Sequence, residues 1–551
     1  DRFQLLTCDF DPAHQRLISR EEFLTALDQI EPSPVSRTVS EVLSRQQSVL
    51  ESAGQVNKLA IQVSDFQKST TNLVDIKSDS TLSVLLVPIG SADADNISID
   101  SCWLASPVVQ AGQAVEVTVR IRNHGTADVS SIPVKFMANG SPKSATSVDV
   151  TANGFKDVAI TFTPSDTGWY QCMVSLEDNA VLFDDQYYFS LYVESSVSIV
   201  SINGPSAGPF FKSLFPAGGY FKLVEFGDKQ VDYGTLANAR VVLLNEVRQP
   251  TSGLVSELKK FADRGGVTII IPDSLSDLNA YASLSSALGI GTLGAARSLT
   301  DKVDRLQTED AVFAGVFTSK NGISATTDLP VVNRFYPQIG GVPEVLLRLR
   351  SGDAFLNRYR GVSGQTYLLG ASLSGNMSGL ARHAIFVPVF YRMALLATNP
   401  QALALSIGTD PKLELPSGGY SGDRTFKIKG GSQGLEYIPS QRLAGSSVVI
   451  GFGNTIREAG AYQLTLDGAV ASAPAFNYNR AESLMSFNNA EMLQQQVDEA
   501  RLKHFKVDAT FGAKAMAGNV HSTGIPLWKY CIILVLVLLA IEVMLIKFWK
   551  T

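Results

Sequence analysis

Cysteine is scarce in this 551-residue sequence, with four residues in total, so the chain is not a disulfide-stapled scaffold. Histidine is almost as rare, and the spacing of its five residues indicates no zinc site. A basic surplus is also missing, because the net charge is −6 with acids and bases mixed along the chain. This balance argues against nucleic acid as a partner. The sequence opens without Met or a signal peptide inside a strand-like run, which predicts a fragment or a processed chain.

A single long hydrophobic run lies near the C-terminus. Residues 530–546 are apolar except for Glu542, and with its flanks the run, 525–549, is long enough to cross a bilayer as a helix. Lysines follow it, so the positive-inside rule predicts a cytoplasmic C-terminus with the rest of the chain across the membrane. A buried core helix is the alternative. The residues expected to anchor the helix are Trp528, Tyr530, Glu542, Lys547, Trp549 and Lys550.

The carboxylate of Glu542 has two possible roles in such a helix. A charged group inside a membrane is costly unless it is paired or hydrated. Lys547 lies five residues further on, which is a poor spacing for a helical ion pair. Glu542 is therefore expected either to reach the headgroup region or to contact another membrane helix, and the sequence leaves both open.

Hydrophobic periodicity divides the remaining chain into α/β and all-β regions. Residues 1–92 and 197–400 alternate strand and helix patterns, as α/β domains do. Residues 93–196 and 401–486 change to a period of two with frequent turn signals, which predicts two β-sandwiches. A charged helix and a small-residue tether, 487–524, are expected to lead into the membrane helix. The predicted fold class is multidomain, α/β plus all-β, with a C-terminal transmembrane helix.

The first α/β region is predicted to be half of a doubly wound domain. Ser19 and Glu22 have the spacing of a capping box, which indicates a helix that begins there. The other predicted elements are strands at 3–7, 58–63 and 82–87 and a helix at 40–50.

The first sandwich region contains one recognisable structural motif. Tyr170 stands two residues before Cys172, which is the spacing of a tyrosine corner. Cys102 is the only partner for Cys172 in this region. Two free, buried thiols are favoured over a disulfide between them.

Residues 239–271 give the clearest α/β unit of the second α/β region. A strand ends at Asn245 and Glu246, a helix at 252–264 closes at two glycines, and a strand at 267–271 follows at once. Ligands bind at the carboxyl ends of such strands, so Asn245 and Glu246 are candidate ligand-binding residues. Simple turn formation is the favoured interpretation.

The order of these parts resembles the BatA-type membrane proteins of the Bacteroides aerotolerance group. The strings that carry the resemblance are Ser64-Asp-Phe-Gln67, LLNEVRQPTSGLVSELKKFADRGGVTIIIP, Phe476-Asn-Tyr-Asn-Arg480 with Glu482-Ser483, and Leu527-Trp-Lys529. The resemblance implies, in chain order, a partial von Willebrand A-like domain, a CARDB/Ig-like sandwich, a flavodoxin-type domain like class I glutamine amidotransferases, and a second sandwich. The family's leading membrane helices and first von Willebrand strand have no counterpart here.

The von Willebrand resemblance also implies a metal site. That site binds Mg²⁺ through a D-x-S-x-S motif and a later Asp, and Asp65 matches the later Asp. The D-x-S-x-S motif would lie before Asp1. A turn-capping role for Asp65 beside Phe66 is favoured, and no other cofactor is expected.

Amidotransferase chemistry requires a Cys thiolate on a strand-to-helix elbow and a His that takes its proton. The sequence has no Cys between Cys172 and Cys531, so this activity is not expected. A serine variant with Ser252 or Ser274 beside His383 lacks the G-x-S-x-G frame. A capping or surface role is favoured for His383.

The expected function is therefore a non-enzymatic, membrane-anchored scaffold that binds proteins. The resemblance implies the inner membrane, a periplasmic location for the bulk of the chain, and partners among related membrane proteins, including a von Willebrand-domain protein and a MoxR-type ATPase system. The alternative is a hydrolase or small-ligand-binding protein that uses the crevice of residues 197–400.

Overall fold

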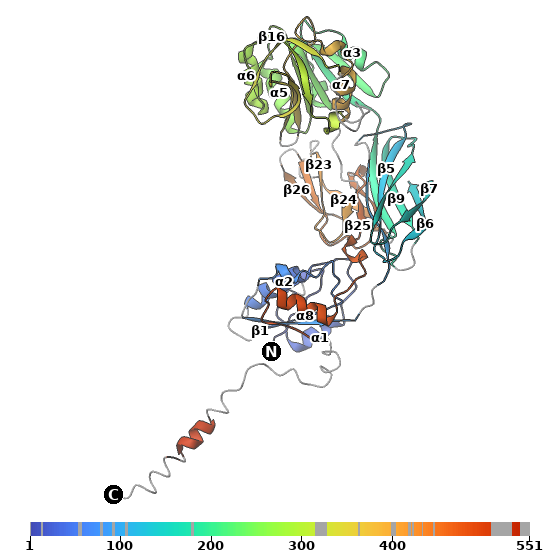
Figure 1. Cartoon of the computed structure of the whole chain (residues 1–551), viewed down its shortest axis with the longest axis vertical. Helices are drawn as coiled ribbons and strands as arrows, with labels where there is room; N and C mark the ends of the chain where they lie inside the picture. The colour runs from blue at the N-terminus through green and yellow to red at the C-terminus, as the bar shows by residue number, and fades with distance from the viewer. Residues whose placement is uncertain are drawn as a thin grey trace, which may run out of the picture. The chain divides into compact units, whose positions relative to one another are not determined.

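The computed structural model places the chain in two compact units. The larger unit comprises Asp1–Arg37 and Ala94–Met485, and the smaller unit comprises Thr38–Asp93 and Ser486–Thr551. The residues that the structure describes are 2–12, 15–52, 58–77, 81–90, 94–104, 108–177, 181–313, 328–361, 364–397, 404–416, 420, 424–431, 434–444, 447–508, 532–539 and 541. Figure 1 shows the elements coloured along the chain.

The larger unit begins with the helix α1 (Arg20–Leu27). Its capping box is confirmed, because Glu22 N donates to Ser19 Oγ at 3.2 Å and Ser19 N donates to Glu22 Oε2 at 2.8 Å. The predicted strand at 3–7 is wrong, since Phe3 forms only an isolated antiparallel bridge with Ile18. A strand needs a series of hydrogen-bonded partners, and this apolar run has only the one bridge.

The first sandwich has two antiparallel sheets, as predicted from the period of two. One sheet contains β3 (Ile97–Leu104), β5 (Val115–Asn123) and β8 (Phe155–Phe162). The other contains β4 (Val109–Gln110), β10 (Gln186–Glu194), β9 (Gly168–Leu176), β6 (Val129–Ala138) and β7 (Ser141–Val150), with β4 joining in parallel. The tyrosine corner is confirmed, because Asp166 N donates to Tyr170 Oη at 3.0 Å.

The α/β domain is built on one nine-stranded sheet with a parallel and an antiparallel part. The parallel strands, in spatial order, are β12 (Phe221–Gly227), β11 (Val197–Asn203), β13 (Val241–Val247), β14 (Val267–Pro272) and β21 (Gln365–Leu369). The antiparallel strands that continue it are β20 (Ala354–Arg360), β19 (Glu344–Leu349), β16 (Arg297–Leu306) and β17 (Val331–Phe335). A separate pair is formed by β15 (Thr292–Leu293) and β18 (Gln338–Ile339).

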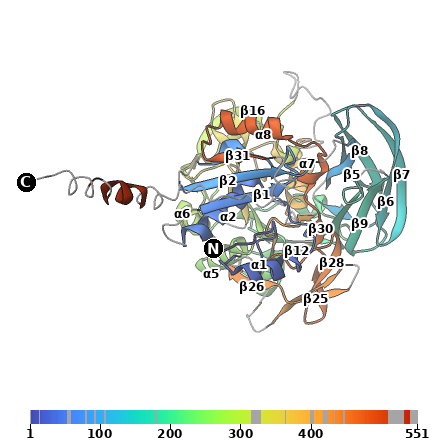
Figure 2. The ribbon, with the colours of Figure 1, turned by 90° about the horizontal axis from the view of Figure 1, so that it is seen from below.

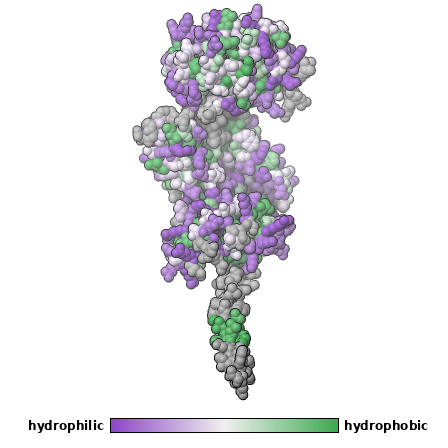
Figure 3. Space-filling model, turned by 90° about the vertical axis from the view of Figure 1, so that its left-hand side faces the viewer, coloured by the Kyte–Doolittle hydropathy of each residue, from purple (hydrophilic) through white to green (hydrophobic). Residues whose placement is uncertain are grey.

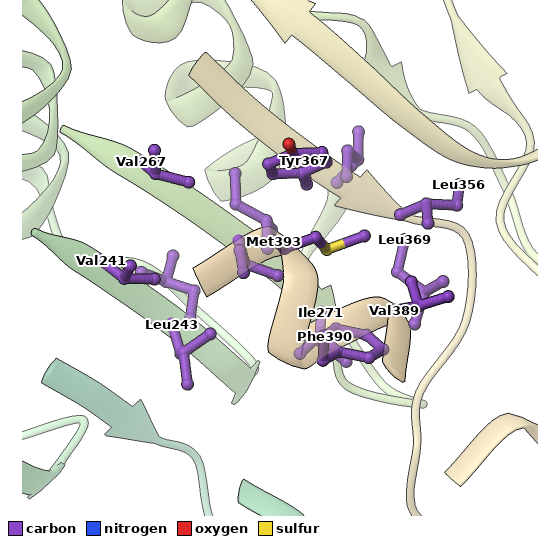
Figure 4. Packing of buried hydrophobic residues seen from close by; sticks show 14 of the residues in the cluster. Val241, Leu243, Val267, Ile271, Leu356, Tyr367, Leu369, Val389, Phe390 and Met393 are labelled. Atoms are coloured by element: carbon purple, nitrogen blue, oxygen red, sulfur yellow. The ribbon is translucent and has the colours of Figure 1, made fainter. Parts of the chain in front are cut away.

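Helices cover both faces of this sheet, which explains why the central parallel strands β13 and β14 are buried along their whole length. Figure 1 shows α5 (Ser252–Asp263) and α6 (Leu278–Leu288) on one side, and α3 (Phe210–Leu214) and α7 (Phe386–Leu395) on the other. A further short helix is α4 (Tyr233–Ala237). In Figure 4, side chains of α7 pack on alternate residues of the strands; the labelled ones are Val389, Phe390 and Met393 against Val241, Leu243, Val267, Ile271, Leu356, Tyr367 and Leu369.

The second sandwich follows the α/β domain. Its larger sheet contains β22 (Leu405–Ser406), β30 (Ala475–Asn477), β28 (Gly460–Leu466), β24 (Phe426–Gly430), β25 (Leu435–Tyr437) and β29 (Ala469–Ser472). Its smaller sheet contains β23 (Lys412–Pro416), β27 (Ser447–Gly451) and β26 (Ser440–Ala444). Ile428, Ile450 and Phe476 are fully buried between them.

The smaller unit is a three-stranded parallel sheet in the order β1 (Lys58–Ser64), β2 (Leu82–Pro88) and β31 (Phe505–Val507). The helices α2 (Val39–Glu51) and α8 (Ala490–Glu499) pack with the strands in one core. Figure 2 shows β31 beside β2. The prediction of a tether that begins at 505 is therefore wrong at its start. Three residues give little periodicity, and their partner strand lies about 420 positions earlier.

The described part of the chain contains no helix that is both long and apolar enough to cross a membrane. Residues 532–539 are helical, and their apolar side chains are exposed, as the green surface in Figure 3 shows. Most of the predicted segment 525–549 lies outside the described residues, as do all six anchoring residues, Trp528, Tyr530, Glu542, Lys547, Trp549 and Lys550.

Candidate functional site

The strand order of the α/β domain locates the place where a ligand would be expected. Numbered along the chain, the parallel strands follow the order 2-1-3-4-5, in which connections leave β11 and β13 on opposite sides. Such a switch point opens a crevice at the carboxyl ends of the two strands. The residues at these ends are Asn203 and Asn245, and Asn245 Nδ2 donates to Asn203 Oδ1 at 2.9 Å. The two side chains thus bridge the switch point themselves.

Glu246 forms a sharp elbow at the end of β13. Its backbone has φ 56°, which is a sparsely populated region for a residue with a side chain, and the ladder shifts register at this point. The side chain is fully buried, and its Oε1 accepts from Ser372 Oγ at 2.5 Å and from Ser374 N at 2.6 Å. Both serines follow β21, so the carboxylate reaches across the sheet edge and ties two strand ends together.

Gly204 makes the elbow possible. A Cβ at this position would lie 1.8 Å from the carbonyl oxygen of Glu246, so the loop after β11 can approach β13 only with glycine. Gly204 N donates to the carbonyl oxygen of Asn245 at 2.8 Å. The turn interpretation of Asn245 and Glu246 thus has a specific geometric basis.

Asp273 is a second fully buried carboxylate at this edge, directly after β14. Its Oδ1 accepts from Leu275 N at 2.8 Å and from Arg248 Nε at 3.2 Å. The Arg248 guanidinium also donates to Ser206 Oγ at 3.0 Å. Arg248 therefore links the end of β14 to the loop that follows β11.

Two tyrosine hydroxyls donate hydrogen bonds to backbone carbonyls at the same edge of the sheet. Tyr281 Oη donates to the carbonyl oxygen of Val247 at 2.7 Å, and Tyr336 Oη donates to that of Asp273 at 3.0 Å. Burial raises the pKa of Tyr281, and the nearby hydroxyl of Tyr336 and carboxylates of Asp273 and Glu246 add to the rise. The phenol of Tyr281 is therefore held as a neutral donor.

We call this set the carboxyl-edge cluster; it comprises Asn203, Asn245, Glu246, Arg248, Asp273, Ser372 and Ser374. Sequence reasoning found Asn245 and Glu246 because they follow an apolar strand. The same signal was available for Asp273, which follows Pro272 at the end of the next strand. Ser372 and Ser374 carry no such signal, because only the sheet order brings them to Glu246.

The candidate base His383 lies just ahead of α7. Its Nδ1 accepts from Ile385 N at 3.2 Å, and its Nε2 lies 3.7 Å from Oδ2 of the exposed Asp328. No hydrogen bond joins His383 to Ser252 or Ser274 within the described ranges. Ser252 instead opens α5, whose N-cap is Thr251. Ile385 is itself the N-cap residue of α7, and no side chain among the described residues caps this helix, so the expected capping role of His383 is not found.

The cysteines of the first sandwich are free thiols, and both Cys102 and Cys172 are buried. This is the outcome that was favoured over a disulfide. Burial raises the pKa of Cys172 to about 12 and raises that of Cys102 as well. Both thiols are thus protonated and unreactive at neutral pH.

Asp65 lies in a tight turn after β1. Ser64 Oγ donates to Asp65 Oδ1 at 3.3 Å and accepts from Phe66 N at 3.1 Å, and Phe66 is fully buried with φ 50°. Over the described ranges, no group of three or more His, Cys, Asp or Glu side chains is arranged to hold a metal ion.

Two sandwiches of the larger unit meet at a set of hydrogen bonds, most of them buried or partly buried, that we call the joint. Tyr188 N donates to Asn477 Oδ1 and Asn477 Nδ2 donates to Tyr188 O, both at 2.7 Å. Arg480 donates from Nε to Ile99 O at 2.7 Å and from Nη2 to Gln186 O at 2.6 Å. The string 476–480, singled out in the sequence, is thus part of the joint.

The joint continues through Asn96. Its Nδ2 donates to Asp184 Oδ2 and to the carbonyl oxygen of Ser483, each at 2.8 Å. All three residues are buried, and burial raises the pKa of Asp184 although hydrogen bonds from Ser483 and Asn96 and the charge of Arg480 oppose the rise.

Comparison with known proteins identifies one domain. The family model CARDB matches residues 94–182, which places a CARDB domain in the first sandwich. A solution structure of the CARDB domain of PF1109 from Pyrococcus furiosus is 18% identical, with a TM-score of 0.17, and covers 18% of this chain and 97% of that chain. A crystal structure of the same domain, described as in complex with di-metal ions, is 20% identical with a TM-score of 0.17. It covers 19% of this chain and 97% of that chain.

A second kind of likeness covers a larger part of the chain. A putative ThuA-like protein from Bacteroides uniformis is 16% identical, with a TM-score of 0.27, and covers 37% of this chain and 94% of that chain. No curated protein matches the chain.

Proposed function

We propose that this chain is a non-enzymatic scaffold anchored in the inner membrane, with its bulk in the periplasm and its C-terminus in the cytoplasm. The anchor is supported by the apolar run 525–549, whose length, aromatic flanks and terminal lysines suit a membrane helix. The order of predicted domains, which resembles BatA-type proteins, supports the scaffold role.

The observation that carries the non-enzymatic part is the burial of Glu246. In amidotransferases the elbow residue is the nucleophile and must touch the substrate. Here the elbow side chain has no exposed surface, and Ser372 and Ser374 occupy one of its carboxylate oxygens, Oε1. A closed elbow supports a structural role for this edge over the hydrolase alternative.

The partners that we propose are proteins of the same membrane, including a von Willebrand-domain protein and a MoxR-type ATPase system, as the resemblance implies. The smaller unit offers support for protein partners, because Leu59, Ile61 and Val63 on β1 are 46%, 37% and 59% exposed on the side away from the core. Asp65 is a candidate Mg²⁺ ligand only if further ligands join it.

Alkaline extraction of membranes tests the anchor. We expect the full chain to stay in the membrane pellet and a Leu536→Asp/Leu539→Asp variant to be released, since each buried Asp opposes insertion by about 3 kcal/mol. A Leu536→Ile/Leu539→Ile variant is the matched control and should stay. Release of the unaltered chain would contradict the anchor.

Turnover assays on ester and amide substrates test the non-enzymatic part. The full chain and Glu246→Gln should show the same background rate, because neither has an accessible nucleophile. A rate that depends on Glu246 would favour the hydrolase alternative. Affinity purification from native membranes then identifies the co-purifying chains, and absence of any membrane protein among them would count against the scaffold.

A further inference from the structure

Two carboxylates of the carboxyl-edge cluster each leave one oxygen without a partner. Glu246 and Asp273 are both fully buried, and their Oε1 and Oδ1 atoms accept the hydrogen bonds described above. Within the described chain, Glu246 Oε2 and Asp273 Oδ2 have no hydrogen-bond partner. An anionic oxygen buried in this way is costly unless something satisfies it.

The sheet order brings the two carboxylates to the same place. Glu246 follows β13 and bonds Ser372 and Ser374, which follow β21, while β14 lies between these two strands. The Glu246 side chain therefore crosses the end of β14, where Asp273 stands. The ladder agrees, because Val247 pairs with Pro272.

The unsatisfied atoms at this edge are all acceptors. They are the side-chain oxygens of Asn245, Glu246 and Asp273. The joint is different, because its unsatisfied atoms include a donor, Arg480 Nη1, beside the acceptors Asn96 Oδ1 and Asp184 Oδ1. A water molecule can donate to two acceptors but leaves the charge of carboxylates uncompensated, whereas a hard cation binds the acceptors and neutralises their charge as well.

We propose that Glu246 Oε2 and Asp273 Oδ2 bind a hard metal cation, and that this cation is Ca²⁺. Arg248 is the one cationic side chain hydrogen-bonded to this pair in the described ranges, and it engages Asp273 Oδ1 only. The described ranges offer no third acidic or His side chain here, so the remaining ligands would have to be neutral oxygens of hydroxyls and backbone. Ca²⁺ accepts such irregular sets, while Mg²⁺ demands octahedral geometry and keeps waters that a buried site excludes.

Calorimetry of the full chain after EDTA treatment tests this site, with bound metal measured by mass spectrometry. Ca²⁺ at about 100 times its dissociation constant should raise the melting temperature of the α/β domain by about 5–10 °C. The tryptophans provide an internal reference, because none lies in residues 197–397 while Trp103 and Trp169 lie in the first sandwich. Their fluorescence transition should not move.

Glu246→Gln keeps the size of the side chain and removes its charge, so it should abolish the calcium shift. The matched control is Glu257→Gln, an acid on α5 that pairs with Lys260 at the surface and should leave the shift intact. If Glu246→Gln does not fold, the calcium shift is measured instead on Asp273→Asn, which should lose it. The calcium titration of the unaltered chain then shows whether the site exists. The absence of both bound calcium and a shift in the unaltered chain would overturn the site, and an equal shift with Mg²⁺ would overturn the assignment to calcium.

Discussion

The carboxyl-edge cluster and the joint both bury charge in the larger unit, and they deal with it differently. At the joint, the positive Arg480 donates to two backbone carbonyls, and the amide of Asn96 donates to Asp184. At the edge, Arg248 is the one cationic side chain hydrogen-bonded to either carboxylate in the described ranges, and it reaches one oxygen of Asp273. Among the unsatisfied atoms of the described residues, those at the joint include a donor, Arg480 Nη1, beside acceptors, while those at the edge are all acceptors.

This difference separates two uses of buried polar groups. A set that contains both donors and acceptors can be completed within the folded chain or by water. A set of acceptors alone that includes two carboxylate oxygens also needs a partner that compensates their charge. We therefore propose that the joint serves assembly and that the edge binds a ligand.

The largest effect is expected from Arg480→Ala, which would make the joint resemble the edge. The change removes two charge-assisted hydrogen bonds and the positive charge that opposes the burial penalty on Asp184. We expect a loss of about 3–5 kcal/mol in the free energy of unfolding. Urea unfolding followed by tryptophan fluorescence measures it through Trp103 and Trp169.

Arg424→Ala is the control for that change. Arg424 forms an ion pair with Asp467 at the surface, so its loss should cost about 1 kcal/mol or less. Equal losses for the two variants would show that the joint is no more important than a surface ion pair.

Gly204→Ala should have an intermediate effect, because it forces apart the two loops that close the edge. The new Cβ would meet the carbonyl oxygen of Glu246 at 1.8 Å, and we expect a loss of more than about 2 kcal/mol. Calorimetry of the α/β transition checks this. Gly227→Ala, with no atom within 4 Å of its Cβ, should leave the transition nearly unchanged, and a similar loss there would contradict the clash.

The smallest expected effect is on how the free energy of unfolding of Asp184→Asn depends on pH. Burial raises the pKa of Asp184, so the folded chain holds this proton more tightly than the unfolded chain. Ionised Asp184 then costs stability above its folded pKa and costs nothing below the unfolded value of about 3.9. Any free-energy advantage of Asp184→Asn over the unaltered chain should shrink as the pH falls from 7 to 4. A gap that stays constant with pH would contradict this.

Local features were the most predictable from sequence. The capping box at Ser19, the corner at Tyr170 and the strand, helix, glycine and strand unit around α5 each depend on neighbouring residues, and the structure has all three. Asn245 and Glu246 were also found, because an acid after an apolar strand is a local pattern.

Features that depend on distant contacts were not predictable. The pairing of β31 with β2 needs a contact across most of the chain, and three residues show no useful period. The bonds from Ser372 and Ser374 to Glu246 arise only when β13, β14 and β21 line up in the sheet. The donor balance that distinguishes the joint from the edge is likewise a property of the packed structure.

The pairing of β2 with β31 also means that this sheet can be completed only late in synthesis. Val84 and Phe505 are register partners, so the third strand leaves the ribosome about 420 residues after the second. At roughly 5–20 residues per second, the nascent sheet waits on the order of a minute with β2 unpaired on that side. Meanwhile the domains between them can fold, and Ala94 N and Met485 O, 3.1 Å apart, then hold the two ends of the intervening stretch together. The strand that completes the sheet of the smaller unit is thus made only after the domains between β2 and β31.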